Sequence, residues 1–142
     1  MADQITTQTI ADTSGVKYVT KMTNFSDGTG ESLVTKVDAS ATTFMSEDAE
    51  RKISKIWYSI NTTNQKSAVE LLWAGTGSNQ TAVILSGNGY WDFREAGDEL
   101  KNNATSATGD VLLSTRNFAN GDNYTIIAVS YTHLTLPTIL LV

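Results

Sequence analysis

Short runs rich in Val, Ile, Thr, Tyr and Trp recur along this chain, and Gly, Asn, Asp and Ser separate them. No long segment has the 3.6-residue periodicity of an amphipathic helix. β-Branched and aromatic residues favour strands, and the separating residues favour tight turns. The pattern therefore predicts an all-β fold. We expect a single antiparallel β-sandwich of about eight or nine strands, either jelly-roll-like or Ig-like.

Alternation of side chains along the chain marks the expected strands. They are Gln4–Ala11, Val16–Asn24, Ser32–Asp38, Ile53–Ile60, Ala68–Trp73, Thr81–Leu85, Tyr90–Phe93, Val111–Thr115 and Tyr124–Ala128. Since Thr81–Leu85 is almost wholly apolar, it is expected to be a central strand that is covered on both faces. The inward faces predict a core of Met22, Ile56, Tyr58, Leu71, Trp73, Ile84, Val111, Leu113 and Ile126.

The segments between the strands carry turn residues. Asn88-Gly89 and Asn120-Gly121 suit type I′ or related turns, because Asn and Gly tolerate positive φ. One helical turn is expected within Thr42–Lys52. The longest stretch without a strand pattern is Arg94–Asp110, in which Arg94–Lys101 fits a helix and the remainder fits an exposed loop. Long loops in compact domains are often functional, so this stretch is a candidate contact segment.

The C-terminal segment Val129–Val142 is expected to be an artefactual tail. Its first ten residues match, residue for residue, the translation of an adapter used in sequencing-library preparation. We therefore expect residues 1–128 to form one domain, and the tail to have no native partner. The last strand is expected to continue to about Leu134, with exposed chain beyond it. The only histidine, His133, and the only proline, Pro137, belong to this tail.

Composition narrows the range of functions. The net charge is −5 and the charges are dispersed, which argues against nucleic acid and anionic membranes as partners. No cysteine is present, so disulfides and thiolate chemistry are excluded. The N-terminus lacks the features of a signal peptide, and no apolar run is long enough to cross a bilayer. We expect the chain to be made in the cytoplasm of its host cell.

Catalytic and metal-binding patterns are weak. Nucleophilic triads need a base, and the single histidine lies in the tail. Paired carboxylates among Asp92, Glu95, Asp98 and Glu99 fit a solvated acidic loop better than a hydrolytic site. Asp27 and Glu31 supply only part of a calcium site. We therefore expect no enzymatic activity, no catalytic, cofactor-binding or metal-binding residue, and no cofactor.

Aromatic residues allow two interpretations. Trp57-Tyr58 and Tyr90-Trp91, together with Trp73, could form a platform on which carbohydrate rings stack. Aromatics at alternating strand positions are more often core residues, cross-strand pairs or subunit contacts, which is the interpretation we favour.

Several segments, in this order, resemble a family of small structural proteins of marine tailed bacteriophages. They are residues 1–10, 22–32, 36–38, 53–59, 70–73, 92–94, 102–104, 108–110 and 121–127. The resemblance covers nearly all of the chain before the tail. It implies a non-enzymatic component of a tailed-phage virion, most readily a capsid decoration or head-surface protein, located in the virion. Its partners would be other virion proteins, and homo-oligomers remain open.

An alternative is a carbohydrate- or receptor-binding module of a tail or head fibre. Exposure of Trp57, Trp73 or Trp91 around a polar groove would favour this alternative, and burial of all three would oppose it. A glycan hydrolase would instead need two carboxylates of the acidic loop to converge in a cleft. A docking protein should show an apolar or aromatic patch at one sheet edge or loop cluster.

Overall fold

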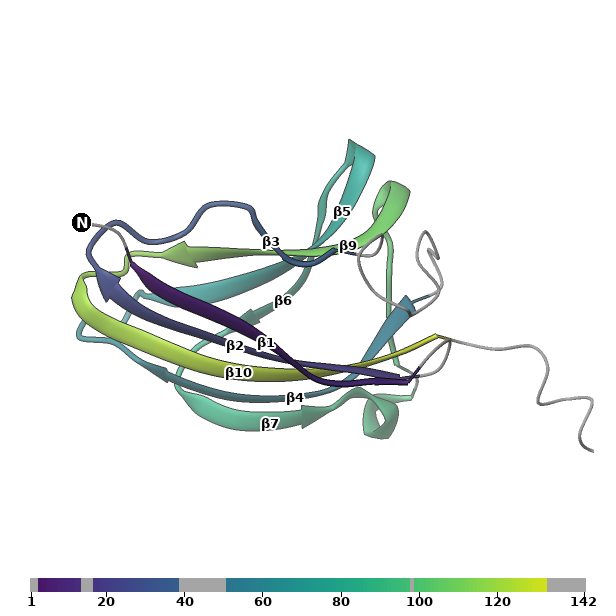
Figure 1. Cartoon of the computed structure of the whole chain (residues 1–142), viewed down its shortest axis with the longest axis horizontal. Helices are drawn as coiled ribbons and strands as arrows, with labels where there is room; N and C mark the ends of the chain where they lie inside the picture. Colours follow the sequence, from purple (N-terminus) through teal and green to yellow (C-terminus); the bar gives the residue numbers. More distant parts are fainter. Residues whose placement is uncertain (1–2, 14–16, 39–50, 98, 133–142) are drawn as a thin grey trace, which may run out of the picture.

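The computed structural model describes residues 3–13, 17–38, 51–97 and 99–132. These residues form ten strands and one short 3-10 helix, drawn in Figure 1. The strands are β1 (Gln4–Thr13), β2 (Lys17–Asp27), β3 (Val34–Val37), β4 (Arg51–Asn61), β5 (Ala68–Ser78), β6 (Gln80–Leu85), β7 (Asn88–Asp92), β8 (Leu100–Lys101), β9 (Thr105–Arg116) and β10 (Asn120–Thr132), and the helix is η2 (Phe93–Ala96). None of the helices in these ranges is long and apolar enough to span a membrane.

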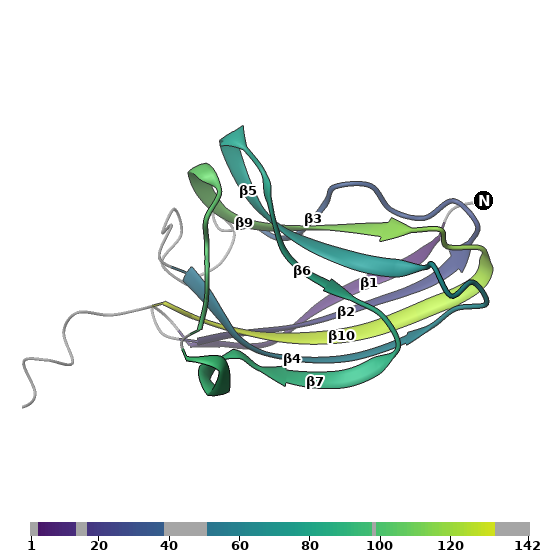
Figure 2. The same cartoon turned by 180° about the vertical axis from the view of Figure 1, so that it is seen from behind.

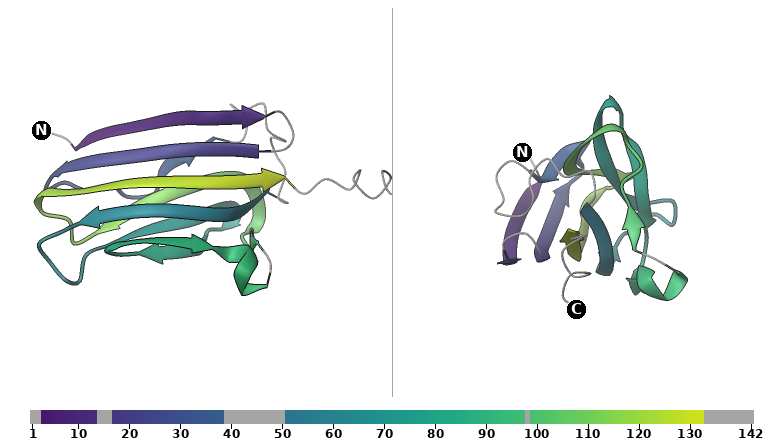
Figure 3. Two further views of the ribbon diagram at one scale, coloured as in Figure 1. Left: turned by 90° about the horizontal axis from the view of Figure 1, so that it is seen from below. Right: turned by 90° about the vertical axis from the view of Figure 1, so that its right-hand side faces the viewer.

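Two antiparallel sheets face each other as layers (Figures 1 and 2). The six-stranded sheet has the order β1-β2-β10-β4-β7, with β8 also paired to β4 (Figure 3, left). The four-stranded sheet has the order β3-β9-β5-β6. Thus β2-β10-β4-β7 faces β3-β9-β5-β6, and the chain crosses repeatedly between the layers, as in a jelly roll. The predicted all-β sandwich is confirmed, and its topology is the jelly-roll alternative.

The core fills the space between the layers. Seven residues predicted for it are buried: Met22, Ile56, Leu71, Trp73, Val111, Leu113 and Ile126. Tyr58, also predicted, is partly buried and packs against them. Trp73 and Leu113 are fully enclosed, so the centre of the domain is closely packed.

Ile84 was expected in the core, and this prediction is wrong. Its side chain is 59% exposed, whereas the next residue, Leu85, is 1% exposed. Strand β6 is the edge of the four-stranded sheet, not a central strand covered on both faces. Ile84 pairs with Glu70 on the outer face, and a register shift lies just beyond that pair in the ladder of β5 and β6. Apolar composition alone does not reveal such an edge position.

Of the two predicted turns, the one at Asn120-Gly121 is present and the one at Asn88-Gly89 is wrong. Asn88 and Gly89 belong to β7, and the chain passes from β6 to β7 by crossing between the sheets. Asn120 and Gly121 open β10, which lies in the other sheet from β9. Type I′ hairpins are absent at both places, because such hairpins join neighbouring strands of one sheet. Asn120-Gly121 nevertheless forms a related turn, since the Asp122 backbone N–H donates to the Ala119 carbonyl at 3.0 Å and Gly121 has a φ of +95°.

The segment Arg94–Asp110 is more ordered than predicted. Its helical part is only the 3-10 turn η2, and it also contains β8 and the first residues of β9. The helical turn expected within Thr42–Lys52 lies outside the described residues, apart from residues 51–52, which begin β4.

Strand β10 continues to Thr132, past the expected domain boundary at residue 128. Val129 pairs with Val19 on one side and Lys55 on the other, and it is buried. Residues 133–142 lie outside the described part, so the origin of the tail and its expected exposure stay predictions.

Candidate functional site

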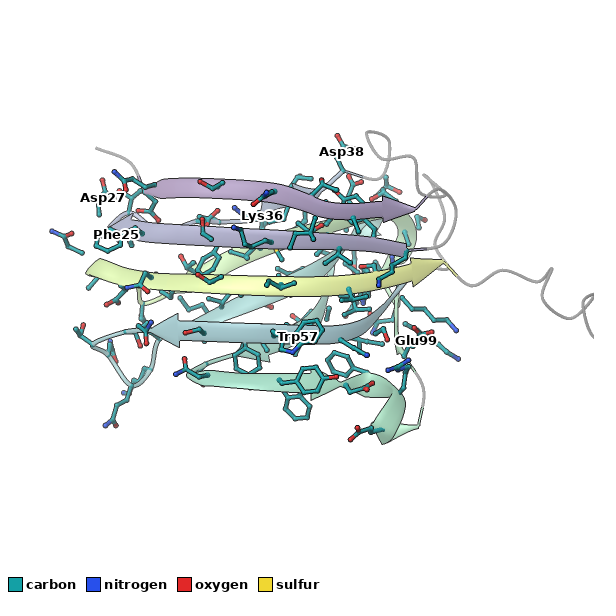
Figure 4. All side chains as sticks on the ribbon, turned by 60° about the horizontal axis from the view of Figure 1, so that its bottom comes forward. Phe25, Asp27, Lys36, Asp38, Trp57 and Glu99 are labelled. Carbon is teal, nitrogen blue, oxygen red and sulfur yellow. The ribbon has the colours of Figure 1, made fainter. Side chains whose placement is uncertain are left out.

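Large aromatic side chains gather where the six-stranded sheet ends at β7. Trp57 on β4 and Tyr90 and Trp91 on β7 are 43%, 47% and 49% exposed, and Phe93 begins η2 directly after β7. Together, Trp57, Tyr90, Trp91 and Phe93 are called the aromatic edge below. Figure 4 shows Trp57 on the outer face, over β4 and beside β7.

Pairing of β4 with β7 positions these rings. Trp57 is the direct cross-strand partner of Tyr90, and their rings stack with centroids 5.0 Å apart and planes 23° apart. Trp91 pairs with the buried Ile56, so it points to the opposite face of the strand. There it stacks on Phe93, with centroids 6.1 Å apart and planes 6° apart. The aromatic edge therefore presents rings on both faces of the edge strand.

A groove runs beside Trp57 on the outer face of the sheet. It has a volume of about 260 Å³ and is lined by Trp57, Tyr58, Ser59, Gly89, Thr125 and Ile127. Thr125 is the cross-strand partner of Ser59, and Ile127 is that of Trp57. Ser59 and Thr125 thus adjoin an exposed indole, but the exposed lining of the groove is mostly apolar, so only the exposure of Trp57 matches the expected mark of a carbohydrate-binding face, and the polar groove does not.

Charged groups lie at the rim of the aromatic edge. Asp92 caps η2 by accepting from the Arg94 backbone N–H, and its carboxylate also forms an ion pair with the Arg94 guanidinium at 3.1 Å. These interactions hold the pKa of Asp92 below its ordinary value. Partial burial and the negative charges of Asp92 and Glu95 raise the pKa of Tyr90, so its hydroxyl remains a proton donor at neutral pH.

The acidic residues considered for hydrolysis have other surroundings. Asp92 forms an ion pair with Arg94, Glu95 is exposed, and Asp98 lies outside the described residues. Glu99 is partly exposed and precedes β8. In the described part of the chain, no group of three or more His, Cys, Asp or Glu side chains is placed to hold a metal ion.

The Glu31 side chain, a candidate calcium ligand from the sequence, points into the protein interior instead. Its Oε1 accepts hydrogen bonds from Asn24 Nδ2 at 2.7 Å and Tyr124 Oη at 2.5 Å. Its Oε2 lies 2.5 Å from Lys36 Nζ, and both side chains of that ion pair are 1% exposed. Asp27, the other calcium candidate, accepts from the backbone N–H of Thr29 within its own turn.

Asp3 extends this buried network to the start of the chain. Its Oδ2 accepts from Asn24 Nδ2 at 3.0 Å, and its Oδ1 accepts from the backbone N–H of Asp27 at 3.0 Å. Burial acts to raise the pKa of Asp3, but these hydrogen bonds outweigh it and lower the pKa. Burial and the neighbouring Glu31 raise the pKa of Tyr124 far above its ordinary value.

Sequence reasoning placed Trp73 in the core correctly, but it missed Lys36 as a buried residue. Lys36 lies at a register shift between Thr35 and Val37, where an extra residue enters the pairing of β3 with β9. A single charged residue in a short strand is ordinarily taken as outward-facing, so the sequence offers no signal for this bulge.

No protein-family model matches the chain, and no curated protein matches it. Among solved structures, it is similar to a mutant of a family 29 carbohydrate-binding module that was studied for its mechanism of ligand recognition. The TM-score is 0.40 and the identity is 9%, over 97% of this chain and 95% of that chain. A similarity this weak carries no argument about function.

Proposed function

We propose that this protein is a non-enzymatic structural component of a tailed-phage virion, which docks on a capsid or another virion protein through the aromatic edge. The observation that carries the docking surface is the exposure of Trp57, Tyr90 and Trp91 at one margin of one sheet. Aromatic residues that lose water on association supply much of the energy of protein–protein binding. An aromatic patch at a sheet edge is what a docking protein was expected to have.

The surroundings of the aromatic edge suit a protein interface. Apolar rings form its centre, while Asp92, Arg94 and Glu95 provide a charged rim beside it. Interfaces commonly combine a desolvated centre with a polar rim. The contact segment predicted at Arg94–Asp110 begins in this rim, so its first residues would join the same contact.

The identity of the partner is supported by the phage-protein resemblance of the sequence segments. The jelly-roll topology is compatible with it, since capsid proteins use this architecture, but lectins use it as well. A capsid decoration or head-surface position is the placement that we propose.

A second candidate is a carbohydrate- or receptor-binding module that uses the same edge. The exposed Trp57 favours it, with Ser59 and Thr125 in the lining of the same groove, whereas the mostly apolar surface of that groove does not. Aromatic faces stack on sugar rings, while hydroxyl groups bind sugar hydroxyls. In this alternative the aromatic edge would face a glycan on the host surface instead of another virion protein.

The test mixes the purified full chain with capsids or tails of a related phage that lack the protein. In parallel, the chain is applied to a panel of bacterial polysaccharides. Saturable binding to particles that persists in moderate salt supports the virion proposal. Absence of particle binding together with tight polysaccharide binding overturns it in favour of the second candidate, and cleavage of a polysaccharide overturns the non-enzymatic assignment.

A further inference from the structure

We propose that Lys36 and Asn24 become joined by an intramolecular isopeptide bond, with Glu31 as the proton-transfer residue. This proposal is independent of the aromatic edge and of the proposed function. It concerns the buried network at the side of the sandwich where β2 of one sheet approaches β3 of the other.

One carboxylate brings the two reacting groups together. Glu31 Oε2 lies 2.5 Å from Lys36 Nζ, and Glu31 Oε1 accepts from Asn24 Nδ2 at 2.7 Å. Amine and amide thus contact the two oxygens of one group. Figure 4 shows Lys36 behind β1 and β2 when the six-stranded sheet faces the viewer, and its place in β3 assigns it to the other layer. Water is excluded, since Asn24 is 2% exposed and the side chains of Lys36 and Glu31 are 1% exposed.

Before any reaction, buried polar atoms of Lys36 and Asn24 lack hydrogen-bond partners within the described ranges. Lys36 Nζ has three donors, but the Glu31 carboxylate is the only partner found for it among the described residues. Asn24 Oδ1 is buried and has no hydrogen-bond partner in the same part of the chain. Burying an ion pair with incomplete hydrogen bonding is costly. Conversion of the ammonium to a neutral amide, with one of its protons left on Glu31, removes both buried charges.

The chemistry balances within the protein. Lys36 transfers a proton to Glu31, which leaves a neutral amine that attacks Cγ of Asn24. The Nζ–Cγ bond forms, and the Cγ–Nδ2 bond breaks. The departing nitrogen takes a second proton from the lysine nitrogen, relayed by Glu31, and leaves as ammonia. The products are a secondary amide, ammonia and a protonated Glu31. No oxidant or cofactor is consumed.

Two neighbouring side chains would act as positioning residues. Tyr124 Oη donates to Glu31 Oε1, and its raised pKa keeps it in the donating form. Asp3 accepts from Asn24 Nδ2, so the departing nitrogen is held between two carboxylates. The Tyr124 contact restrains the Glu31 carboxylate, and the Asp3 contact restrains the Asn24 amide.

The bond would tie the two layers of the sandwich together. Strand β3 is a short edge strand of the four-stranded sheet, so it is hydrogen-bonded to a neighbouring strand on one side only. The chain has no cysteine, so a disulfide cannot supply this restraint. A covalent link between β2 and β3 would therefore attach this short edge strand to the other sheet.

Mass spectrometry of the full chain tests the proposal. We expect the folded protein, after incubation at neutral pH, to weigh one ammonia less than the sequence requires. Trypsin should then fail to cleave after Lys36, and residues 22–51 should appear as one peptide that lacks ammonia. An unchanged mass overturns the proposal. Ammonia loss with separate peptides 22–36 and 37–51 also overturns it, because that result indicates a succinimide at an asparagine and no bond at Lys36.

Matched variants provide controls. Lys36→Arg keeps the positive charge but cannot form the amide, so its mass should be unchanged, whereas Lys66→Arg at an exposed site should still lose ammonia. Circular dichroism checks that each variant folds. If Lys36→Arg does not fold, Glu31→Gln replaces it, and the wild-type peptide map still decides the outcome. Ammonia loss that persists in a folded Lys36→Arg protein overturns the proposal.

Discussion

Trp57 and Tyr90 are direct partners on neighbouring antiparallel strands, and their rings stack 5.0 Å apart while each remains more than 40% exposed. Stacking restricts both side chains before any partner arrives. A restricted aromatic pair loses less conformational entropy on binding than two freely rotating rings would. The pair is therefore a preorganised centre for the aromatic edge.

Replacement of Trp73 tests the core. Trp73 is fully buried among both layers, so Trp73→Ala should lower the free energy of unfolding by about 3–5 kcal/mol. Phe25→Ala is the control, because Phe25 is 54% exposed and its loss should change stability by about 0.5 kcal/mol or less. Urea unfolding measures both. A cost below about 1 kcal/mol for Trp73→Ala would contradict its central position.

Consecutive residues of β6 test the corrected strand orientation. Leu85→Ala should destabilise the protein by about 2–5 kcal/mol, since Leu85 lies in the core. Ile84→Ala should change stability by less than about 0.5 kcal/mol, because Ile84 points outward from an edge strand. Thermal or urea unfolding of the two variants provides the comparison. The reverse ranking would show that β6 has the opposite orientation.

Glu70 makes stability depend on pH. Burial acts to raise the pKa of Glu70, but hydrogen bonds from Thr81 and Arg116 outweigh it and hold the pKa below the ordinary value. A lowered pKa in the folded state adds stability above the unfolded-state pKa of about 4.3. That contribution is lost as the pH falls through the folded-state pKa.

The variant Glu70→Gln isolates this effect. It should be less stable than the wild type at pH 7, and the difference should shrink as the pH falls below about 4. Glu95→Gln, at an exposed position, serves as the control and should follow the wild type at both ends of the range. Urea midpoints across this pH range give the measurement. A difference that grows toward low pH would refute the assigned sign.

Much of the fold could be predicted because, along each strand of a two-layered sandwich, alternate side chains face the core and the solvent. Met22 and Ile56 alternate with polar or exposed neighbours, and each was placed correctly in the core. The pattern failed at Ile84, because an apolar residue on the outer face of an edge strand looks the same in sequence as one in a central strand. Register shifts are set by pairing between distant segments, so local sequence does not reveal them.

The candidate site was only partly predictable for the same reason. The sequence marked Trp57 and Trp91 as possible surface aromatics, but their exposure depends on β7 being the last strand of its sheet. The pairing of Glu31 with Lys36 depends on a bulge in β3 and on a turn that points a carboxylate inward. Neither feature follows from residue type or spacing.

The most direct test of the account compares particle binding by two variants that each lose exposed aromatic surface. Trp57→Ala/Tyr90→Ala removes the stacked pair, and Phe25→Ala removes an exposed ring at the far end of β2 on the same sheet (Figure 4). Binding to phage particles that lack the protein is measured by titration. If docking uses the aromatic edge, the double variant should lose affinity at least roughly tenfold, equivalent to about 1.4 kcal/mol, and Phe25→Ala should keep wild-type affinity. Equal affinity of the double variant and the wild type would contradict docking through the aromatic edge.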